Sequence, residues 1–287
     1  MEQSPVAKVF TGADNIDVAQ RIIDKNFLKL FILNVLPQIN YYKNYVDEQH
    51  YLGIENNLKE IIKVNQKKTE EENPLDVIEP GDEDLTTTTT TTTTVYDIQY
   101  EKVFSTLQEI NKDTVGWLTV NNTRIDYPVV QAKDNDYYLN KSFDKSYNEA
   151  GWVFMDYRNN EKEFDKNTIL YAHGRYDNTM FGTLKNVLNN NWIKDSNNYI
   201  IKISTENENT LWQVFSVYHI KTTSDYLKIN FNKEDEYKEF LNMLIKRSAY
   251  DFNTSIDEND KILTLSTCFN NSEKMVMHAK LIKKMTK

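Results

Sequence analysis

Two residues of this chain have the types and settings needed for nucleophilic chemistry. Cys268 is the only cysteine among 287 residues and ends the apolar segment LTLSTC, while His173 stands near the end of the apolar segment ILYAHG. A thiol is mostly protonated at neutral pH, so a nucleophilic cysteine needs a neighbouring base or cation. If both segments are strands with neighbouring ends, His173 is the candidate base. The alternative for a lone cysteine is a small buried side chain without chemistry.

The remaining histidines and the cysteine count narrow the kinds of site. His50 lies in a polar N-terminal region, and His219 and His278 lie inside regular apolar segments, where a structural role is the expectation. One cysteine excludes an intrachain disulfide and a multi-cysteine metal site. No acidic loop favours calcium, so we expect no metal and no cofactor. A thiol without a partner thiol also suits an exported protein.

The elements that must position these residues are predominantly strands. Leu211–Ile220 alternates apolar and polar residues, as a strand with one buried side does. Residues 232–247 are typical of a helix, with Asn232 as its N-cap. The segments rich in Val, Ile, Tyr and Phe predict further strands: GWLTV, RIDYPVVQ, GWVFMDYR, NTILYAHG, YIIKIST, KILTLSTC and KMVMHAKLIKK. So many strands with few helices predict a mainly β fold, closed or nearly closed into a barrel.

Composition divides the chain into three regions. Residues 1–68 are expected to be helical; their most apolar run, Phe27–Leu36, has ten residues and is too short to span a bilayer. We interpret it as a core or interfacial helix, with a shortened anchor as the alternative. Residues 69–95 are acidic and then carry nine consecutive threonines, which predicts a disordered linker. Residues 96–287 form the expected catalytic domain.

The charge distribution argues against nucleic acid as a partner. The formal net charge is -9, but residues 70–84 alone contain eight acids and no base, so residues 85–287 sum to about -2. No basic stripe is present to neutralise a phosphate backbone.

Several motifs, in order and almost without gaps over residues 98–284, resemble one family. TLSTC followed by a strand with HAKL resembles the sortases, thiol transpeptidases of Gram-positive bacterial surfaces. The resemblance is specifically to class B, and it is carried by WLTVNNTRIDYPVVQAKDNDYYLN, GWVFMDYRN, NTILYAHGRYDNTMFGTLKN and SDYLKINF. It implies an eight-stranded sortase barrel with N-terminal helices and a helix in the loop before the seventh strand.

The resemblance also implies a reaction and partners. Cys268 would attack the Thr carbonyl of a sorting signal resembling NPxT[N/G], forming a thioacyl enzyme, and an amine of a cell-wall peptide or peptidoglycan precursor would take the acyl group. His173 would act as acid and then as base. The substrates would be surface proteins with a C-terminal sorting signal, handled near the membrane, on the extracellular face of the cytoplasmic membrane.

One position departs from the family pattern. The third catalytic residue is normally an arginine four residues before the histidine of the HAK motif, and this chain has Lys274 there. Lysine keeps the charge but lacks the planar fork that donates two parallel hydrogen bonds. A solvated lysine at a strand edge is the alternative for Lys274, and Arg158 is a possible substitute for the missing arginine.

Residues that would line the groove for the sorting signal are also implied by the resemblance. Plain core packing is the alternative for the two leucines, and Tyr171 and Met180 are expected to pack beneath His173. The implied groove residues are Asn135, Leu139, Thr222, Tyr226, Leu227 and Ser266.

Two other functions stay open on the sequence alone. A thiol hydrolase would release the peptide to water instead of to an amine. A sortase-like module weakened by Lys274 would bind sorting signals without turning them over.

Overall fold

The computed structural model describes Asn56, residues 100–268 and residues 272–286. His50, the apolar run Phe27–Leu36 and the acidic and threonine-rich segment 69–95 lie outside these residues. Within the described part of the chain, no helix combines the length and the apolar character needed to cross a membrane.

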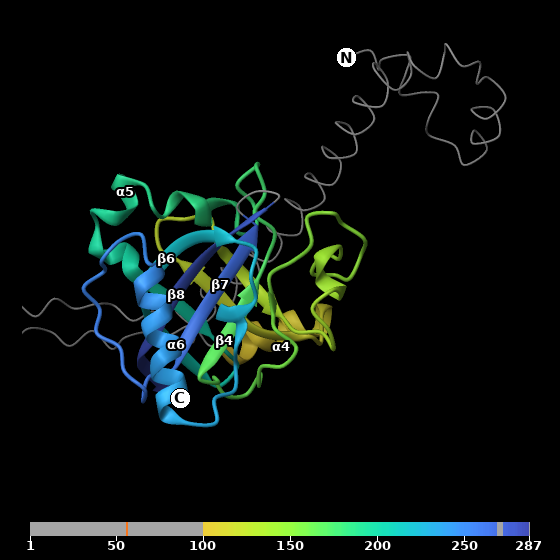
Figure 1. The fold of residues 1–287 in the computed structure, drawn as a ribbon. Helices are drawn as coiled ribbons and strands as arrows, with labels where there is room; N and C mark the ends of the chain where they lie inside the picture. Colours follow the sequence, from red (N-terminus) through yellow and green to blue (C-terminus); the bar gives the residue numbers. More distant parts are fainter. Residues whose placement is uncertain (1–55, 57–99, 269–271, 287) are drawn as a thin grey trace, which may run out of the picture. The chain divides into compact units, whose positions relative to one another are not determined.

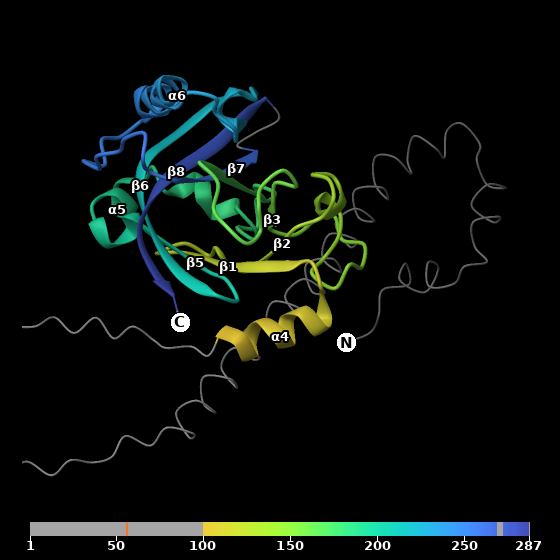
Figure 2. The ribbon, with the colours of Figure 1, turned by 90° about the horizontal axis from the view of Figure 1, so that it is seen from below.

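Eight strands close into a barrel (Figures 1 and 2), which confirms the predicted mainly β architecture. The order around the barrel is β1-β2-β3-β4-β7-β8-β6-β5. The β2–β3 and β4–β7 pairs are parallel and the others are antiparallel. The strands are β1 (Thr114–Val120), β2 (Asp126–Val130), β3 (Phe154–Met155), β4 (Asn167–Tyr171), β5 (Ile200–Ser204), β6 (Glu208–Lys221), β7 (Ile262–Cys268) and β8 (Glu273–Thr286).

In the described chain from residue 100 onward, one helix precedes β1, and the others lie in connections between strands. The long helix α6 lies before β7, the seventh strand, as expected. The helices are α4 (Tyr100–Ile110), α5 (Asn190–Ile193) and α6 (Glu234–Arg247), with short 3₁₀ turns η2 (Tyr137–Leu139), η3 (Gly182–Asn186), η4 (Ser196–Tyr199) and η5 (Asp225–Leu227). In Figure 2, α4 lies beside β1 and α6 lies on the far side of the barrel.

The start of α6 differs from the prediction that Asn232 caps it. Lys233 occupies the N-cap position, and no side chain caps the helix there. Instead, the backbone N–H of Asn232 donates to Oε2 of Glu236, at 2.8 Å, inside the first turn. The Glu236 carboxylate therefore binds a backbone donor just before the helix, and an acid in the first turn also interacts favourably with the positive end of the helix dipole.

The core has two parts because β6 is covered on both faces. Interior side chains such as Val214 and Val217 fill the barrel, while Phe215 and Tyr218 belong to a second cluster beneath Leu244 of α6. All residues from 214 to 218 are therefore buried. The predicted one-sided burial of this strand is wrong over these residues, because α6 packs against its outer side (Figure 1).

The strand predicted from GWVFMDYR is reduced to Phe154–Met155. Directly after it, the backbone N–H of Arg158 donates to Oδ1 of Asp156 at 3.0 Å, which closes a turn. A side chain that bonds its own backbone two residues on competes with the strand ladder. The predicted segment runs on to Arg158, but the backbone leaves the sheet after Met155.

Candidate active site

Strands β4 and β7 place His173 beside Cys268. They are parallel neighbours whose last pair is Tyr171 with Ser266. Beyond this pair the contact continues, because Oγ1 of Thr267 donates to the carbonyl of Ala172 at 2.7 Å. The next residues along the two segments are His173 and Cys268. The structure therefore brings these two residues together where the neighbouring strands end.

Two glycines allow this close approach. A Cβ on Gly174 would stand 2.1 Å from the carbonyl oxygen of Cys268, so only glycine lets the two backbones lie this near. Gly151 has φ of +61°, and a Cβ there would meet the carbonyl of Tyr138 at 2.6 Å and the His173 ring at 3.1 Å. Glycine tolerates both the left-handed conformation and the missing space.

Cys268 is exposed, and a cation contacts its sulfur. Cys268 and Lys274 are paired across the antiparallel β7–β8 ladder. Nζ of Lys274 donates to Sγ at 3.1 Å. The ammonium of Lys274 is thus a charged hydrogen-bond donor directly at the sulfur. Lys274 is therefore neither a free surface lysine nor remote from the nucleophile.

The His173 ring is held by a backbone carbonyl. Its Nε2 lies 2.7 Å from the carbonyl oxygen of Leu139. Because a carbonyl only accepts, Nε2 carries a proton in this arrangement. Nδ1 is then the ring nitrogen that can exchange a proton with a reacting group. The ring is partly exposed, so substrate atoms can reach it.

The expected groove residues lie on both sides of this pair. On one side, Leu139 of η2 has 38% of its surface exposed and is not a core leucine. Asn135, just before η2, is half-buried. On the other side, Thr222 is exposed and bonds the carbonyl of Ser272 through its backbone N–H at 3.0 Å and through Oγ1 at 3.2 Å, and Leu227 of η5 is half-buried.

Tyr226 and Ser266 lie deeper than the other groove residues. Both are almost fully buried, and the hydroxyl of Tyr226 lies 3.0 Å from Oγ of Ser266. Burial is the main reason why the pKa of Tyr226 is raised, with the Cys268 charge adding to it. These two residues support the floor beside Cys268, whereas Leu139 and Thr222 face solvent.

Tyr171 and Met180, expected beneath His173, occupy different settings. Met180 is fully buried. Tyr171 is half-buried, and its hydroxyl donates to Oδ2 of Asp156 at 2.9 Å. Burial raises the pKa of Tyr171, and the nearby Asp156 charge raises it further.

Asp156 is a feature that sequence reasoning missed. Burial alone raises the pKa of its carboxyl, but hydrogen bonds from Arg158, Tyr171 and Asn135 outweigh burial and leave that pKa below its usual value. Arg158 contacts this carboxylate through Nε and Nη2, each at 2.8 Å, so its guanidinium is bound there. The spacing of two in DYRN is a local signal for the ion pair, but nothing in it reveals the more distant partners.

The other histidines of the described chain lie outside this constellation. His219 is exposed on β6 and lies 3.7 Å from Glu273. His278 is fully buried; its Nδ1 lies 2.9 Å from Oγ1 of Thr264 and its Nε2 lies 2.9 Å from the hydroxyl of Tyr218. Burial, and then the Arg247 charge, lower its pKa to about 3, so the ring is neutral.

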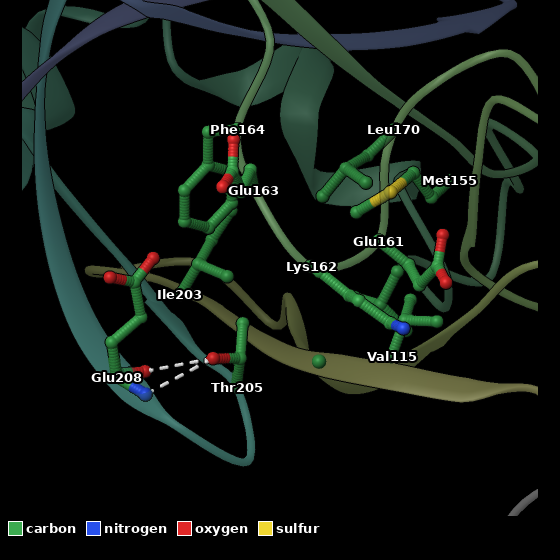
Figure 3. A pocket seen from close by; sticks show the side chains of 12 residues that line it. Val115, Met155, Glu161, Lys162, Glu163, Phe164, Leu170, Ile203, Thr205 and Glu208 are labelled. Atoms are coloured by element: carbon green, nitrogen blue, oxygen red, sulfur yellow. Dashed lines mark hydrogen bonds between the residues drawn. The ribbon is translucent and has the colours of Figure 1, made fainter.

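The small pocket in Figure 3 lies elsewhere and contains neither Cys268 nor His173. It is lined by β1, β5 and the segment before β4, including Val115, Phe164 and Ile203, and none of the candidate residues belongs to it. Its volume of about 10 Å³ has room for about one water molecule. A peptide chain does not fit there, so the open surface at Cys268 is the candidate site.

Comparison with known proteins shows the family to which the chain belongs. The Sortase domain family matches residues 118–282. Sortase B of Listeria monocytogenes is 36% identical over 182 residues, covering 62% of this chain and 73% of its own. Two solved structures, sortase B complexed with triglycine and the Staphylococcus aureus sortase B–substrate complex, each give a TM-score of 0.60 at 35% identity and cover 64% of this chain and 86% of their own.

The chain forms a closed barrel with a thiol at the end of β7, and the family model matches more than half of the chain. These two findings define the class of protein. The chain belongs to the sortases and is a cysteine transpeptidase. Within that family it is of class B, as its curated relatives and structural neighbours are.

Proposed function

We propose that this transpeptidase cleaves a sorting signal resembling NPxT[N/G] after its Thr and joins the Thr carbonyl to a cell-wall amine. The observation that carries the proposal is the environment of one sulfur. Sγ of Cys268 accepts a hydrogen bond from Lys274 at 3.1 Å and stands at the strand end next to His173. A nucleophile with a cation and a base at hand suits acyl transfer.

The first half of the reaction forms the thioester. The Cys268 thiolate attacks the Thr carbonyl carbon, and the carbonyl π electrons move to oxygen. Protonated His173 gives its Nδ1 proton to the leaving amine as the C–N bond breaks, because Nε2 remains bonded to Leu139. Lys274 keeps its proton and redirects its hydrogen bond from the sulfur to the developing oxyanion as negative charge moves there.

The second half reverses the proton transfers. The acceptor amine enters, neutral His173 removes its proton at Nδ1, and the nitrogen attacks the thioester carbonyl. The C–S bond breaks, and the thiolate returns to its contact with Lys274. A group that has acted as acid must act as base in the reverse half of a two-step transfer.

The residues around Cys268 and the relatives support the choice of substrates. An extended peptide needs apolar walls with a few polar anchors, and Leu139 with Leu227, and Asn135 with Thr222, offer both on the two sides of the nucleophile. One relative was solved with its substrate and another with triglycine, a peptide that begins with an amine. The substrates here are surface proteins with a C-terminal sorting signal, and the acceptor is a peptidoglycan precursor or cell-wall peptide.

The enzyme works on the extracellular face of the cytoplasmic membrane under this proposal. Residues 96–287 are the catalytic domain. Both proposed substrates, the surface proteins and the cell-wall amine, are found near this membrane.

A mass spectrum of the protein incubated with sorting-signal peptides tests the proposal. The expected result is an adduct with the mass of the acyl fragment on Cys268, absent in Cys268→Ala, and a ligated product that requires an added amine. Product without amine would make the protein a hydrolase. Peptide binding without any adduct would make it a binding module, as its lysine in place of arginine allows.

A further inference from the structure

The carboxylate of Asp156 is a buried charge with five hydrogen-bond donors. Its side chain is 0% exposed. Oδ1 accepts from the backbone N–H of Arg158 at 3.0 Å and from Nε at 2.8 Å. Oδ2 accepts from Nη2 of Arg158 at 2.8 Å, the Tyr171 hydroxyl at 2.9 Å and Nδ2 of Asn135 at 3.0 Å. Both oxygens are thus fully used.

These donors come from the segments that surround the nucleophile. Asn135 precedes η2, the turn whose Leu139 carbonyl holds the His173 ring. Tyr171 ends β4, two residues before His173. Arg158 reaches the opposite side, because its Nη2 also donates to the carbonyl of Leu227 in η5 at 3.1 Å.

The order of strands shows that these segments lie on opposite sides of the active pair. The η2 segment follows β2, and η5 follows β6, whereas β4 and β7 lie between them in the order β2-β3-β4-β7-β8-β6. A single carboxylate therefore connects one wall of the groove directly and the other through Arg158. It also holds the strand that carries His173.

We propose that Asp156 is a positioning residue that sets the spacing of the two groove walls and the orientation of His173. This inference rests on the proposed peptide groove. A buried charged network is costly to desolvate and is weak evidence for stability, but it fixes the geometry of the groups it joins. Asp156 acts through Asn135 and Leu227 on peptide binding and, through the Leu139 turn, on the proton transfer of His173.

Asp156→Asn is the first test, because it keeps the size and replaces one acceptor oxygen with a donor. With either amide orientation, a donor of the network loses its acceptor. The expected result is a fall in kcat/KM for a sorting-signal peptide of at least tenfold, with most of it in KM. The rate at which iodoacetamide alkylates Cys268 stays within twofold, because the Lys274 contact lies outside the network.

Two further variants separate positioning from general stability. Tyr171→Phe removes one hydroxyl donor and lowers kcat/KM about threefold. The double variant Tyr171→Phe/Asp156→Asn loses less kcat/KM than the product of the two single losses, because both residues act on one network. Asp260→Asn is the matched control, because it breaks an ion pair between Asp260 and Lys280 at the other end of β7. The side chain of Asp260 is 18% exposed and that of Lys280 is 20% exposed. The kcat/KM of Asp260→Asn stays within twofold of the parent.

Hydrogen exchange gives a readout that does not depend on turnover. In Asp156→Asn, but not in Asp260→Asn, the backbone amides of residues 134–140 and 222–228 exchange faster. If Asp156→Asn does not fold, Arg158→Gln and Tyr171→Phe are expected to show a lower kcat/KM and faster exchange in these segments, both to a smaller extent.

The outcomes distinguish this inference from the proposed function. A folded Asp156→Asn protein with parental kcat/KM, or with parental exchange in both segments, overturns the positioning role. A parent protein that forms no adduct with any sorting-signal peptide overturns the proposed function, and the exchange experiment then still decides whether Asp156 holds the two segments.

Discussion

The contact between Lys274 and Cys268 shows how a lysine can take the position where the family has an arginine. The two residues are directly paired across β7 and β8, so a side chain at 274 points along the same face as the sulfur. The lysine ammonium is a compact charge with three rotatable donors and can follow the charge from sulfur to oxyanion. The ammonium lacks the rigid, planar donor fork of a guanidinium, so it does not bind the oxyanion and the substrate backbone at the same time in one fixed geometry.

Substitution of Lys274 is expected to act on the rate more than on the fold. Lys274→Met removes the donor and lowers kcat/KM by a factor on the order of 100 to 1,000, as the loss of one oxyanion donor does. Lys274→Arg keeps or raises kcat/KM, because the guanidinium supplies the fork. Lys283→Met, an exposed lysine of the same strand, serves as the control with parental kinetics. Peptide cleavage assays measure all three, and a large drop in Lys274→Arg would show a role that only an ammonium fulfils.

The residues of the site differ in how far the sequence could predict them. Cys268 and His173 were predicted because a reactive side chain at the end of an apolar segment is a local pattern. Lys274 followed from the family resemblance, but its contact with sulfur depends on the register of β7 and β8. Asp156 could not be predicted as a connection, because its partner Asn135 and the carbonyl of Leu227 are far from it in the chain and meet only in the closed barrel.

At the scale of elements, the active pair depends on the close approach of two parallel strand ends. The backbone of Gly174 passes so near to that of Cys268 that even a methyl group has no room. The pair Tyr171–Ser266 and the bond from Thr267 to Ala172 fix the register that leads to this point.

Gly174→Ala is therefore expected to displace the ends of β4 and β7 and with them the active pair. Its Cβ would overlap a backbone oxygen at 2.1 Å, so kcat/KM falls at least 100-fold and the melting temperature falls as well. Gly116→Ala is a matched control in β1, where the nearest atom, the carbonyl oxygen of Ser204, is 3.2 Å away and needs only a small shift. Kinetics and thermal unfolding of both variants decide the point. Equal losses in the two would show that the close contact at Gly174 has no special role.

Strand patterns predicted the barrel but not the details that depend on neighbours. The alternation in Leu211–Ile220 indicated one buried side, and it could not show that α6 covers the other. The apolar run around Phe154 indicated a longer strand, and it could not show that the Asp156 carboxylate closes a turn after Met155. In the first case a tertiary contact overrides the local period, and in the second a local hydrogen bond to the Asp156 side chain does so.

At the scale of the whole molecule, a chain of buried polar groups joins several strands. The Thr264 hydroxyl of β7 donates to Oδ1 of Asn167 in β4 at 2.6 Å, so its oxygen accepts from Nδ1–H of His278 in β8. Nε2 of the ring then accepts from the hydroxyl of Tyr218 in β6. Nδ2 of Asn167 donates to the carbonyl of Tyr226 at 3.1 Å, and this bond connects the network to η5.

This network requires a neutral ring, and that requirement predicts a pH dependence of the global stability. A proton on Nε2 would face the Tyr218 hydroxyl in a buried site, and burial together with the Arg247 charge lowers the pKa of His278 from 6.5 to about 3. Between these values the unfolded chain binds a proton that the native protein does not. The stability from this group is therefore fully present above pH 6.5 and declines as the pH falls toward 3.

The loss attributable to His278 is about 2 kcal/mol at pH 5, since each pH unit in this window contributes about 1.4 kcal/mol. Urea unfolding at pH 7 and pH 5 measures it, with carboxylates contributing equally to the parent and to the variants. His278→Gln is less stable than the parent at pH 7, because it loses part of the hydrogen-bond network, but its decline between pH 7 and 5 is smaller by about 2 kcal/mol. His219→Gln, which removes an exposed histidine from β6, is measured alongside it for comparison. If His278→Gln and the parent decline equally, the buried ring is not the group that makes the folded enzyme sensitive to acid.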